Sequence, residues 1–157
     1  MTTRPLFRDA YLREATGLVR AHTDEGGIVL EESLFYPTGG GQPGDSGRIA
    51  WEGGAVGIAT AVKGEGGAIV LVPDAPVSLP APGTVLRQTL DWDRRYRHMR
   101  MHSALHLLSV VVPLPVTGGQ VGAERGRLDF DMPEPPGDAA ALEEALNALI
   151  ARDLAVT

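Results

Sequence analysis

Short apolar segments alternate with glycine-rich polar segments through the first half of the chain. Apolar segments of strand length that are separated by Gly-Gly pairs are typical of β-hairpins, because glycine adopts the positive φ angles that tight turns require. Their recurrence at intervals of about ten residues predicts a small antiparallel β-barrel or a curled sheet. The apolar segments are residues 28–30, 48–51, 55–62 and 68–72.

A proline-rich segment interrupts this pattern. Residues 73–83, PDAPVSLPAPG, hold four of the 12 prolines of the chain. Proline lacks a backbone N–H and fixes φ, so the segment is not helical, and its composition predicts a linker or an extended edge segment. We therefore expect a β-barrel-like domain over residues 1–88 and a second domain over residues 89–157.

The second half changes to a helical pattern. Met101, Leu105, Leu108 and Val112 recur at spacings of four, three and four, which predicts a helix over residues 93–112. Asp91 or Asp93 is expected to cap its start, and Pro113 to end it.

Three further elements are expected after this helix. Gly118, Gly119 and Gly122 indicate a loop, and the alternation in residues 126–131 predicts a half-buried strand. A second helix is predicted to begin after the N-cap Asp138, and residues 154–157 resemble the start of another strand. The apolar stripe of the second helix consists of Leu142, Ala145, Leu146, Leu149 and Ile150. Strands followed by helices and further strands predict the α+β fold class.

Composition narrows the class of protein. The 157 residues are 43% hydrophobic and 22% charged, which is ordinary for a globular protein. There is no apolar stretch of the roughly 20 residues that a membrane helix needs, and the N-terminal residues lack a signal-peptide pattern. We therefore expect a cytoplasmic protein. The absence of cysteine excludes disulfides and any zinc site that needs a thiolate within these residues.

The charge is unevenly distributed. Residues 87–127 carry a net charge of +4, whereas residues 1–86 carry −4 and residues 128–157 carry −6. Arginine suits bidentate contacts with phosphate, so the basic segment predicts contact with nucleic acid. The alternative is that these arginines only line a solvated helix face. The arginine cluster of the basic segment consists of Arg94, Arg95, Arg97 and Arg100.

Three histidines follow one another at four-residue spacing on the predicted helix. His98, His102 and His106 cannot all bind one metal ion, because positions i and i+8 are about 12 Å apart along a helix. One adjacent pair can, since residues at i and i+4 share a face. The alternative is a partly buried histidine stripe without a metal. His22 is the only other histidine, so two of the usual four ligands are not identified.

A glycine-rich segment, LFYPTGGGQPGDSG at residues 34–47, is the second candidate site. Gly39, Gly40 and Gly41 allow a ligand to approach the backbone closely, and Thr38 and Gln42 add hydrogen-bonding groups. The alternative is a strand connection whose glycines only turn the chain. The segment lacks the Lys and Ser/Thr of a phosphate-binding P-loop.

Together, LFYPTGGGQPGDSG, the RHMRMHSALHLL helix and the later GRLDFD segment resemble the editing domain of alanyl-tRNA synthetase and its free-standing relatives, the AlaX-type editing hydrolases. The resemblance extends from about Phe7 to the end of the sequence. It implies a small N-terminal antiparallel β-barrel followed by part of an α/β editing domain of the threonyl/alanyl-tRNA synthetase type.

The resemblance also implies a function. Members hydrolyse the ester of mischarged tRNA(Ala), such as Ser-tRNA(Ala) or Gly-tRNA(Ala), at a zinc site formed by an HxxxH pair and a later CxxxH pair. His102 and His106 match the first pair, whereas His98 has no counterpart among the ligands. Thr38 and Gln42 lie in the loop that reaches the family's editing pocket, so they are assigned to discrimination of the amino acid. The arginine cluster is assigned to the tRNA backbone.

The CxxxH pair of the family does not occur in these residues. We expect a fragment of a longer protein rather than a naturally short member, and zinc affinity should fall when two of four ligands are missing. Two other functions remain open: a non-catalytic module that binds tRNA or a synthetase, and a zinc-dependent hydrolase of another small ester.

Overall fold

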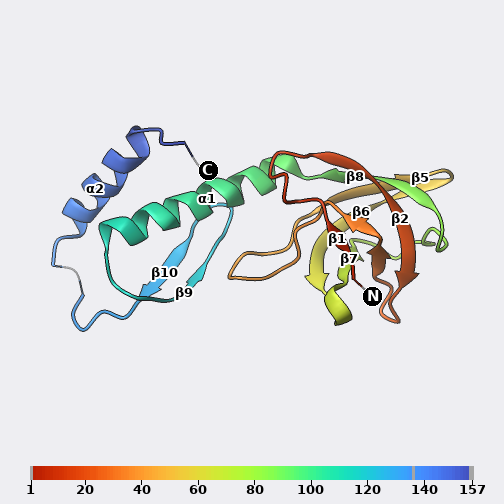
Figure 1. The fold of residues 1–157 in the computed structure, drawn as a ribbon, viewed down its shortest axis with the longest axis horizontal. Helices are drawn as coiled ribbons and strands as arrows, with labels where there is room; N and C mark the ends of the chain where they lie inside the picture. Colours follow the sequence, from red (N-terminus) through yellow and green to blue (C-terminus); the bar gives the residue numbers. More distant parts are fainter. Residues whose placement is uncertain (1, 136, 156–157) are drawn as a thin grey trace. The chain divides into compact units, whose positions relative to one another are not determined.

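The computed structural model describes residues 2–135 and 137–155. The chain forms two compact units, Met1–Tyr96 and Arg97–Thr157, shown from red to green and from green to blue in Figure 1. This division falls within a helix, eight residues after the predicted domain boundary. The boundary between residues 88 and 89 therefore stays a prediction.

The first unit contains a closed antiparallel β-barrel, which confirms the predicted architecture. The strand order around the barrel is β2-β3-β7-β6-β5-β8, and a separate parallel pair joins β1 to β4. A 3₁₀ turn, Glu65–Gly67, connects β6 to β7. The strands are β1 (Arg4–Pro5), β2 (Glu14–His22), β3 (Ile28–Leu30), β4 (Glu32–Ser33), β5 (Gly47–Trp51), β6 (Gly54–Lys63), β7 (Ile69–Pro73) and β8 (Val85–Leu90).

Alternation along the strands fills the barrel with aliphatic side chains. Successive residues of a strand face opposite sides of the sheet, so every second residue enters the interior. Leu34 and Phe35 are fully buried with these side chains, and they anchor the start of the glycine-rich segment in the barrel core. The buried strand residues include Val19, Ile28, Leu30, Ile49, Ile58, Leu71 and Leu86.

One polar side chain inside the barrel orders the approach to the glycine-rich segment. Gln88 of β8 is fully buried, and its Oε1 accepts a hydrogen bond from the Leu34 N–H at 2.9 Å. Its Nε2 donates to the carbonyls of Thr16 (3.2 Å) and Glu32 (3.1 Å). A buried amide stabilises a fold only when its donors and acceptors are satisfied. Here the Gln88 amide joins β8 both to β2 and to residues 32–34.

A buried ion pair fixes the other end of this segment. Arg95 and Asp45 are 4% and 1% exposed, and Arg95 Nε lies 2.9 and 3.0 Å from the two carboxylate oxygens of Asp45. Arg95 Nη2 also donates to Asp45 and, at 3.2 Å, to the Leu34 carbonyl. The carboxylate accepts a further bond from the Tyr36 N–H at 2.6 Å. The first turn of the helix and the glycine-rich segment are thereby joined within the first unit.

The helix predicted over residues 93–112 is α1 (Trp92–Val111). Asp91 caps it as predicted, because its Oδ1 accepts a hydrogen bond from the Arg94 N–H at 3.2 Å. The second unit continues with β9 (Val116–Gln120), β10 (Arg127–Phe130) and α2 (Ala139–Ala151). The predicted cap of α2 is confirmed, since Asp138 Oδ1 accepts from the Ala141 N–H at 3.0 Å. None of the helices in the described ranges is long and apolar enough to cross a membrane.

Three details differ from the sequence analysis. Gly118 and Gly119 lie within β9 rather than in a loop, because they pair with Asp129 and Leu128 of β10 in a two-stranded ribbon. Residues 74–84 connect β7 to β8 within the barrel, so they are not a link between domains. Residues 154 and 155 are not in a strand, and the rest of the predicted terminal strand, residues 156–157, lies outside the described residues.

The buried ion pair gives a stability prediction. Asp45→Asn leaves the Arg95 guanidinium buried without its counter-charge, so the free energy of unfolding should fall by about 3–5 kcal/mol. Urea denaturation measures this change. The matched control is Glu14→Gln, which removes the exposed pair between Glu14 and Arg87 and should cost at most about 1 kcal/mol. Equal losses for the two variants would contradict the role assigned to Asp45.

Candidate functional site

The glycine-rich segment folds into a hairpin-like loop that is closed by successive pairs of hydrogen bonds. At its base, the Asp45 N–H donates to the Tyr36 carbonyl at 2.9 Å. At its tip, Gly39 and Gln42 exchange two backbone hydrogen bonds of 3.0 Å. The two residues between them, Gly40 and Gly41, have φ angles of +60° and +77°, which glycine adopts without a steric penalty. The glycines therefore set the geometry of the tip.

Thr38 lies on one side of this loop and ties it to β6. Its N–H and its hydroxyl donate to the Ala61 carbonyl at 2.9 and 3.2 Å, and its Oγ1 accepts from the Gly44 N–H at 2.9 Å. A hydroxyl oxygen has two acceptor lone pairs, so one remains for a ligand. Gly44 has to be glycine, because a Cβ there would lie 2.0 Å from the Ala61 carbonyl oxygen. Gln42 contributes its backbone to the turn.

Lys63 is a residue of this loop region that the sequence analysis did not identify. It ends β6, and a Cβ on Gly39 would lie 2.8 Å from its Nζ, so the lysine side chain extends across the face of Gly39. It is the only lysine of the chain. The contact between Lys63 and Gly39 depends on how distant segments pair, so local sequence patterns do not predict it. The one hint in the sequence is that Lys63 is a single lysine among many arginines.

The second unit carries the predicted histidine pair. His102 and His106 lie one turn apart on α1, with their rings stacked at 4.8 Å between centroids and their Nε2 atoms 3.1 Å apart. Both side chains are exposed, whereas His98, one turn earlier, is buried at 1% exposure. Partial burial, and then the neighbouring His106, lower the pKa of His102 below its ordinary value. Burial and a second imidazolium both disfavour the protonated ring.

The donor geometry of this pair fits one metal ion. Two nitrogens that bind zinc tetrahedrally at about 2.0–2.1 Å are roughly 3.3 Å apart, close to the observed separation of the Nε2 atoms. A lowered pKa keeps the His102 ring neutral, which is the form that coordinates. Among the described residues, no group of three or more His, Cys, Asp or Glu is placed to hold a metal. A metal ion at this histidine pair therefore stays a prediction.

The four clustered arginines differ in their surroundings. Arg95 is buried in the pair with Asp45, so its guanidinium is not available to a phosphate, which corrects the expectation that the whole cluster faces a tRNA backbone. Arg94 Nη1 donates to the Gly44 carbonyl at 2.8 Å and supports the loop. Arg97 and Arg100 are exposed on α1 in the second unit, where phosphate contact stays a prediction.

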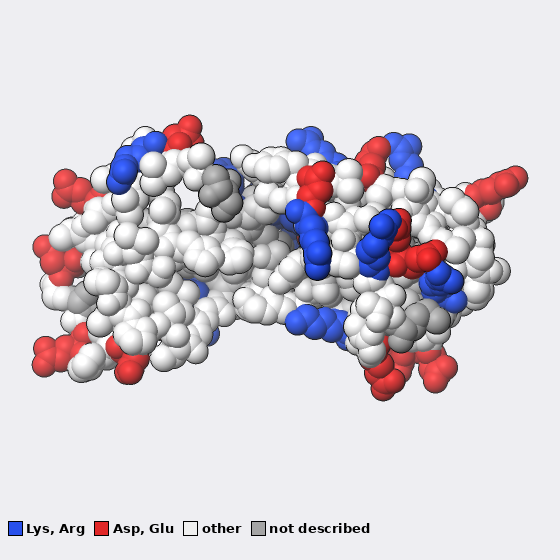
Figure 2. All heavy atoms as spheres, in the orientation of Figure 1, with Lys and Arg blue, Asp and Glu red and all other residues white. Residues whose placement is uncertain are grey.

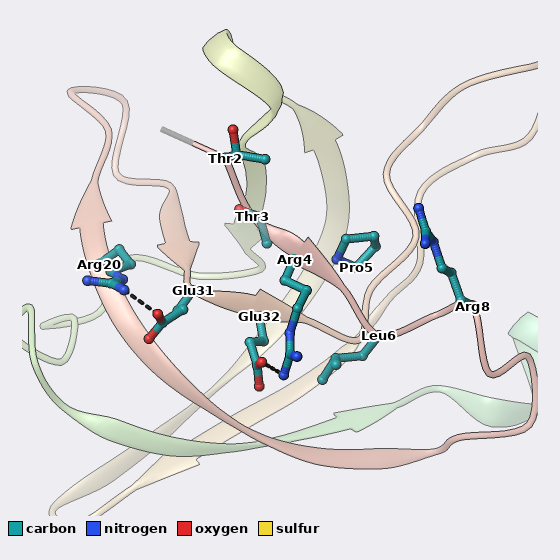
Figure 3. A pocket seen from close by; sticks show the side chains of 9 residues that line it. All are labelled: Thr2, Thr3, Arg4, Pro5, Leu6, Arg8, Arg20, Glu31 and Glu32. Atoms are coloured by element: carbon teal, nitrogen blue, oxygen red, sulfur yellow. Dashed lines mark hydrogen bonds and ion pairs between the residues drawn. The ribbon is translucent and has the colours of Figure 1, made fainter.

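An open cavity of about 960 Å³ in the first unit contains none of the predicted site residues. Figure 3 shows its lining from the N-terminal segment, β2 and the β3–β4 region, with ion pairs joining Arg20 to Glu31 and Arg4 to Glu32. On the face drawn in Figure 2, basic and acidic side chains are interspersed over the barrel unit, while the unit that contains α2 shows more acidic than basic side chains. The predicted site residues thus form two separate candidate sites, the loop in the first unit and the histidine pair in the second.

Comparison with known proteins gives one family match and several similar relatives. The family model described as tRNA synthetases class II (A) matches residues 11–94, from the segment before β2 to the first turn of α1. The alanyl-tRNA editing protein AlaX-M of Methanosarcina acetivorans is 36% identical over 84% of this chain and 58% of its own length. AlaX-M of Pyrococcus horikoshii is 37% identical over 85% of this chain and 62% of its own length.

A full synthetase is also similar. The alanine–tRNA ligase of Pyrobaculum calidifontis is 35% identical over 98% of this chain and 18% of its own length. The chain spans 56–66% of the length of its AlaX-M relatives. The resemblance to the AlaX-type editing proteins is thereby confirmed, and the chain belongs to the family of class II (A) tRNA synthetases and their editing relatives.

Proposed function

We propose that this chain takes part in the hydrolysis of mischarged Ser-tRNA(Ala) or Gly-tRNA(Ala) and releases the amino acid and the free tRNA in the cytoplasm. The observation that carries the proposal is the convergence of the His102 and His106 Nε2 atoms at 3.1 Å, in a chain similar to proteins named alanyl-tRNA editing proteins. Because the chain spans only part of those relatives, it supplies two of the ligands of the proposed zinc site.

The residues present divide the work of such a site. His102 and His106 would hold zinc, which supplies Lewis acidity and lowers the pKa of bound water toward about 7. Partial burial, and then the neighbouring His106, lower the pKa of His102, which favours the neutral ring that coordinates. Gln42 shapes the tip of the glycine-rich loop through its backbone, and the three glycines leave that tip open to a ligand.

Thr38 is the proposed acceptor for the hydroxyl of a seryl ester. Its own hydroxyl proton is directed to the Ala61 carbonyl, so the oxygen can accept but cannot donate to a ligand. A serine hydroxyl would donate a further hydrogen bond to the second lone pair of that oxygen, whereas alanine has no hydroxyl to donate. This difference would protect correctly charged Ala-tRNA(Ala) from hydrolysis.

Metal binding tests the histidine pair directly. His102→Ala and His106→Ala each remove one of two converging donors, so zinc affinity measured by isothermal titration calorimetry should fall by about tenfold or more. His22→Ala is the control, because the His22 ring lies in the barrel unit against the Pro80 carbonyl. Zinc affinity that is unchanged in the His102→Ala variant would contradict the proposed site.

Deacylation tests the reaction. The protein supplied with zinc should release serine from Ser-tRNA(Ala) faster than it releases alanine from Ala-tRNA(Ala), and His106→Ala should abolish most of this rate. Release of radiolabelled amino acid measures both substrates. A protein that cleaves simple seryl esters as fast as Ser-tRNA(Ala) would instead be a hydrolase of small esters.

Specificity tests Thr38 with two substrates on one variant. Thr38→Val should lower kcat/KM for Ser-tRNA(Ala) by about fivefold more than for Gly-tRNA(Ala), because glycine has no hydroxyl to lose a partner and one hydrogen bond is worth about 1 kcal/mol. Any general damage to the loop affects both substrates and cancels in the ratio. Equal losses on the two substrates would remove Thr38 from amino-acid discrimination.

A second candidate function is a non-catalytic module that binds tRNA or a synthetase. Two observations favour it: the described residues supply two metal donors, and Arg97 and Arg100 are exposed on α1. Such a module would bind tRNA with an affinity that falls steeply as salt rises, without deacylation and without stoichiometric zinc.

A further inference from the structure

A row of three aromatic rings, the outer two exposed and the middle one half-buried, lies on the first unit, apart from the glycine-rich loop. Trp92 stacks on Tyr96 with 5.7 Å between ring centroids and 25° between planes, and Tyr11 lies 5.8 Å from Trp92 at 46°. Arg13 places its guanidinium carbon 4.3 Å from the centroid of the Trp92 ring. Tyr11 is 64% exposed and Tyr96 is 41% exposed. We call these four residues the aromatic ladder.

The barrel itself holds the ladder together. Glu14 of β2 pairs with Thr89 of β8, and the Leu90 N–H donates to the Arg13 carbonyl at 3.0 Å. Arg13, the residue before β2, is therefore fixed beside the end of β8, and α1 begins two residues later at Trp92. Trp92 and Tyr96 then share a face because they are four residues apart on a helix.

Tyr11 is held by a turn rather than by a strand. Its N–H donates to Asp9 Oδ1 at 3.1 Å, and the Leu12 N–H donates to the Asp9 carbonyl at 3.2 Å. This turn presents the tyrosine ring beside Trp92 without burying it in the core. Aromatic side chains are usually buried because of their large apolar area. Packing of the barrel core therefore does not explain why two tyrosines stay exposed beside Trp92.

The chemistry of the ladder fits unpaired nucleotide bases. A base stacks on any aromatic face. The exposed Tyr96 ring continues the stack that Trp92 begins, and the exposed Tyr11 ring offers a further face tilted by 46° to Trp92. Arg13 adds a positive charge, and among the described residues it has no carboxylate partner, so this charge remains available to a phosphate. Stacking and an adjacent arginine together are the usual elements of a platform for single-stranded nucleic acid.

We propose that the aromatic ladder stacks unpaired bases of a tRNA, while Arg13 contacts the adjoining phosphate. The choice of tRNA rests on the proposed function, whereas the stacking rests on the four side chains alone. In this proposal the ladder adds affinity by stacking on the bases, without reading their sequence. None of its residues belongs to the histidine pair or is Thr38.

Tryptophan fluorescence tests the proposal. The chain has two tryptophans, so Trp51→Phe leaves Trp92 as the only emitter. A 12-nucleotide single-stranded RNA that ends in CCA should quench Trp92 emission, and deacylated tRNA(Ala) should do the same. A blunt RNA duplex of equal charge should not quench it, because its bases are already stacked on one another.

Substitutions separate the rings from the surrounding surface. Tyr11→Ala and Tyr96→Ala should each weaken binding of the single-stranded RNA by about 5- to 140-fold. Tyr96→Phe keeps the aromatic ring and should bind the RNA as tightly as the parent. Tyr96→Leu keeps apolar area but no ring, and should bind it as weakly as Tyr96→Ala. The matched control is Val85→Ala, because Val85 of β8 is 64% exposed, as is Tyr11, and lies outside the ladder. Arg13→Gln should reduce the salt dependence of binding by about one phosphate contact.

The outcomes separate this proposal from the proposed function. If the tyrosine variants bind the RNA as tightly as the parent while deacylation proceeds normally, the ladder proposal fails and the editing function stands. If the RNA quenches Trp92 and the tyrosine variants lose binding but no mischarged tRNA is deacylated, the ladder stands and the editing function fails. A ladder that instead binds a proline-rich peptide, or that is covered by a second copy in sedimentation experiments, would overturn the proposal.

Discussion

The buried ion pair between Asp45 and Arg95 joins two segments that lie fifty residues apart in the chain. Its carboxylate also accepts the Tyr36 N–H, and its guanidinium also donates to the Leu34 carbonyl. Removing two charges from water is costly, so such a pair persists only where each of its polar atoms is satisfied. The pair therefore fixes the base of the glycine-rich loop and the first turn of α1 with respect to each other.

The two units supply different kinds of chemistry. The barrel unit offers a loop whose glycines expose backbone and whose threonine oxygen accepts a hydrogen bond. The second unit offers two imidazole nitrogens that helical periodicity alone brings together, because residues four apart share one face. In the proposed function, the first would recognise a small side chain and the second would hold the metal. The sequence similarity to AlaX-M proteins covers the residues of both units.

Sequence reasoning succeeded where local rules determine the structure. Alternation of apolar residues predicts the barrel strands, and i, i+4 spacing predicts the His102–His106 contact, because each depends on only a few neighbouring residues. It failed for Arg95, which sits in a basic cluster yet is buried against Asp45. That partnership depends on how the barrel closes, and no periodicity in the chain encodes it. Lys63 across Gly39, and Gln88 inside the barrel, were missed for the same reason.

The contact between Lys63 and Gly39 has a practical consequence for labelling experiments. Since Lys63 carries the only side-chain amine in these 157 residues, a reagent that acylates amines has one internal target, and that target lies across the glycine-rich loop. Modification at this residue can be read from a single mass shift in one peptide. A molecule seated on the loop would shield the amine, so the rate of acylation reports occupancy of the loop directly, independently of any catalytic turnover.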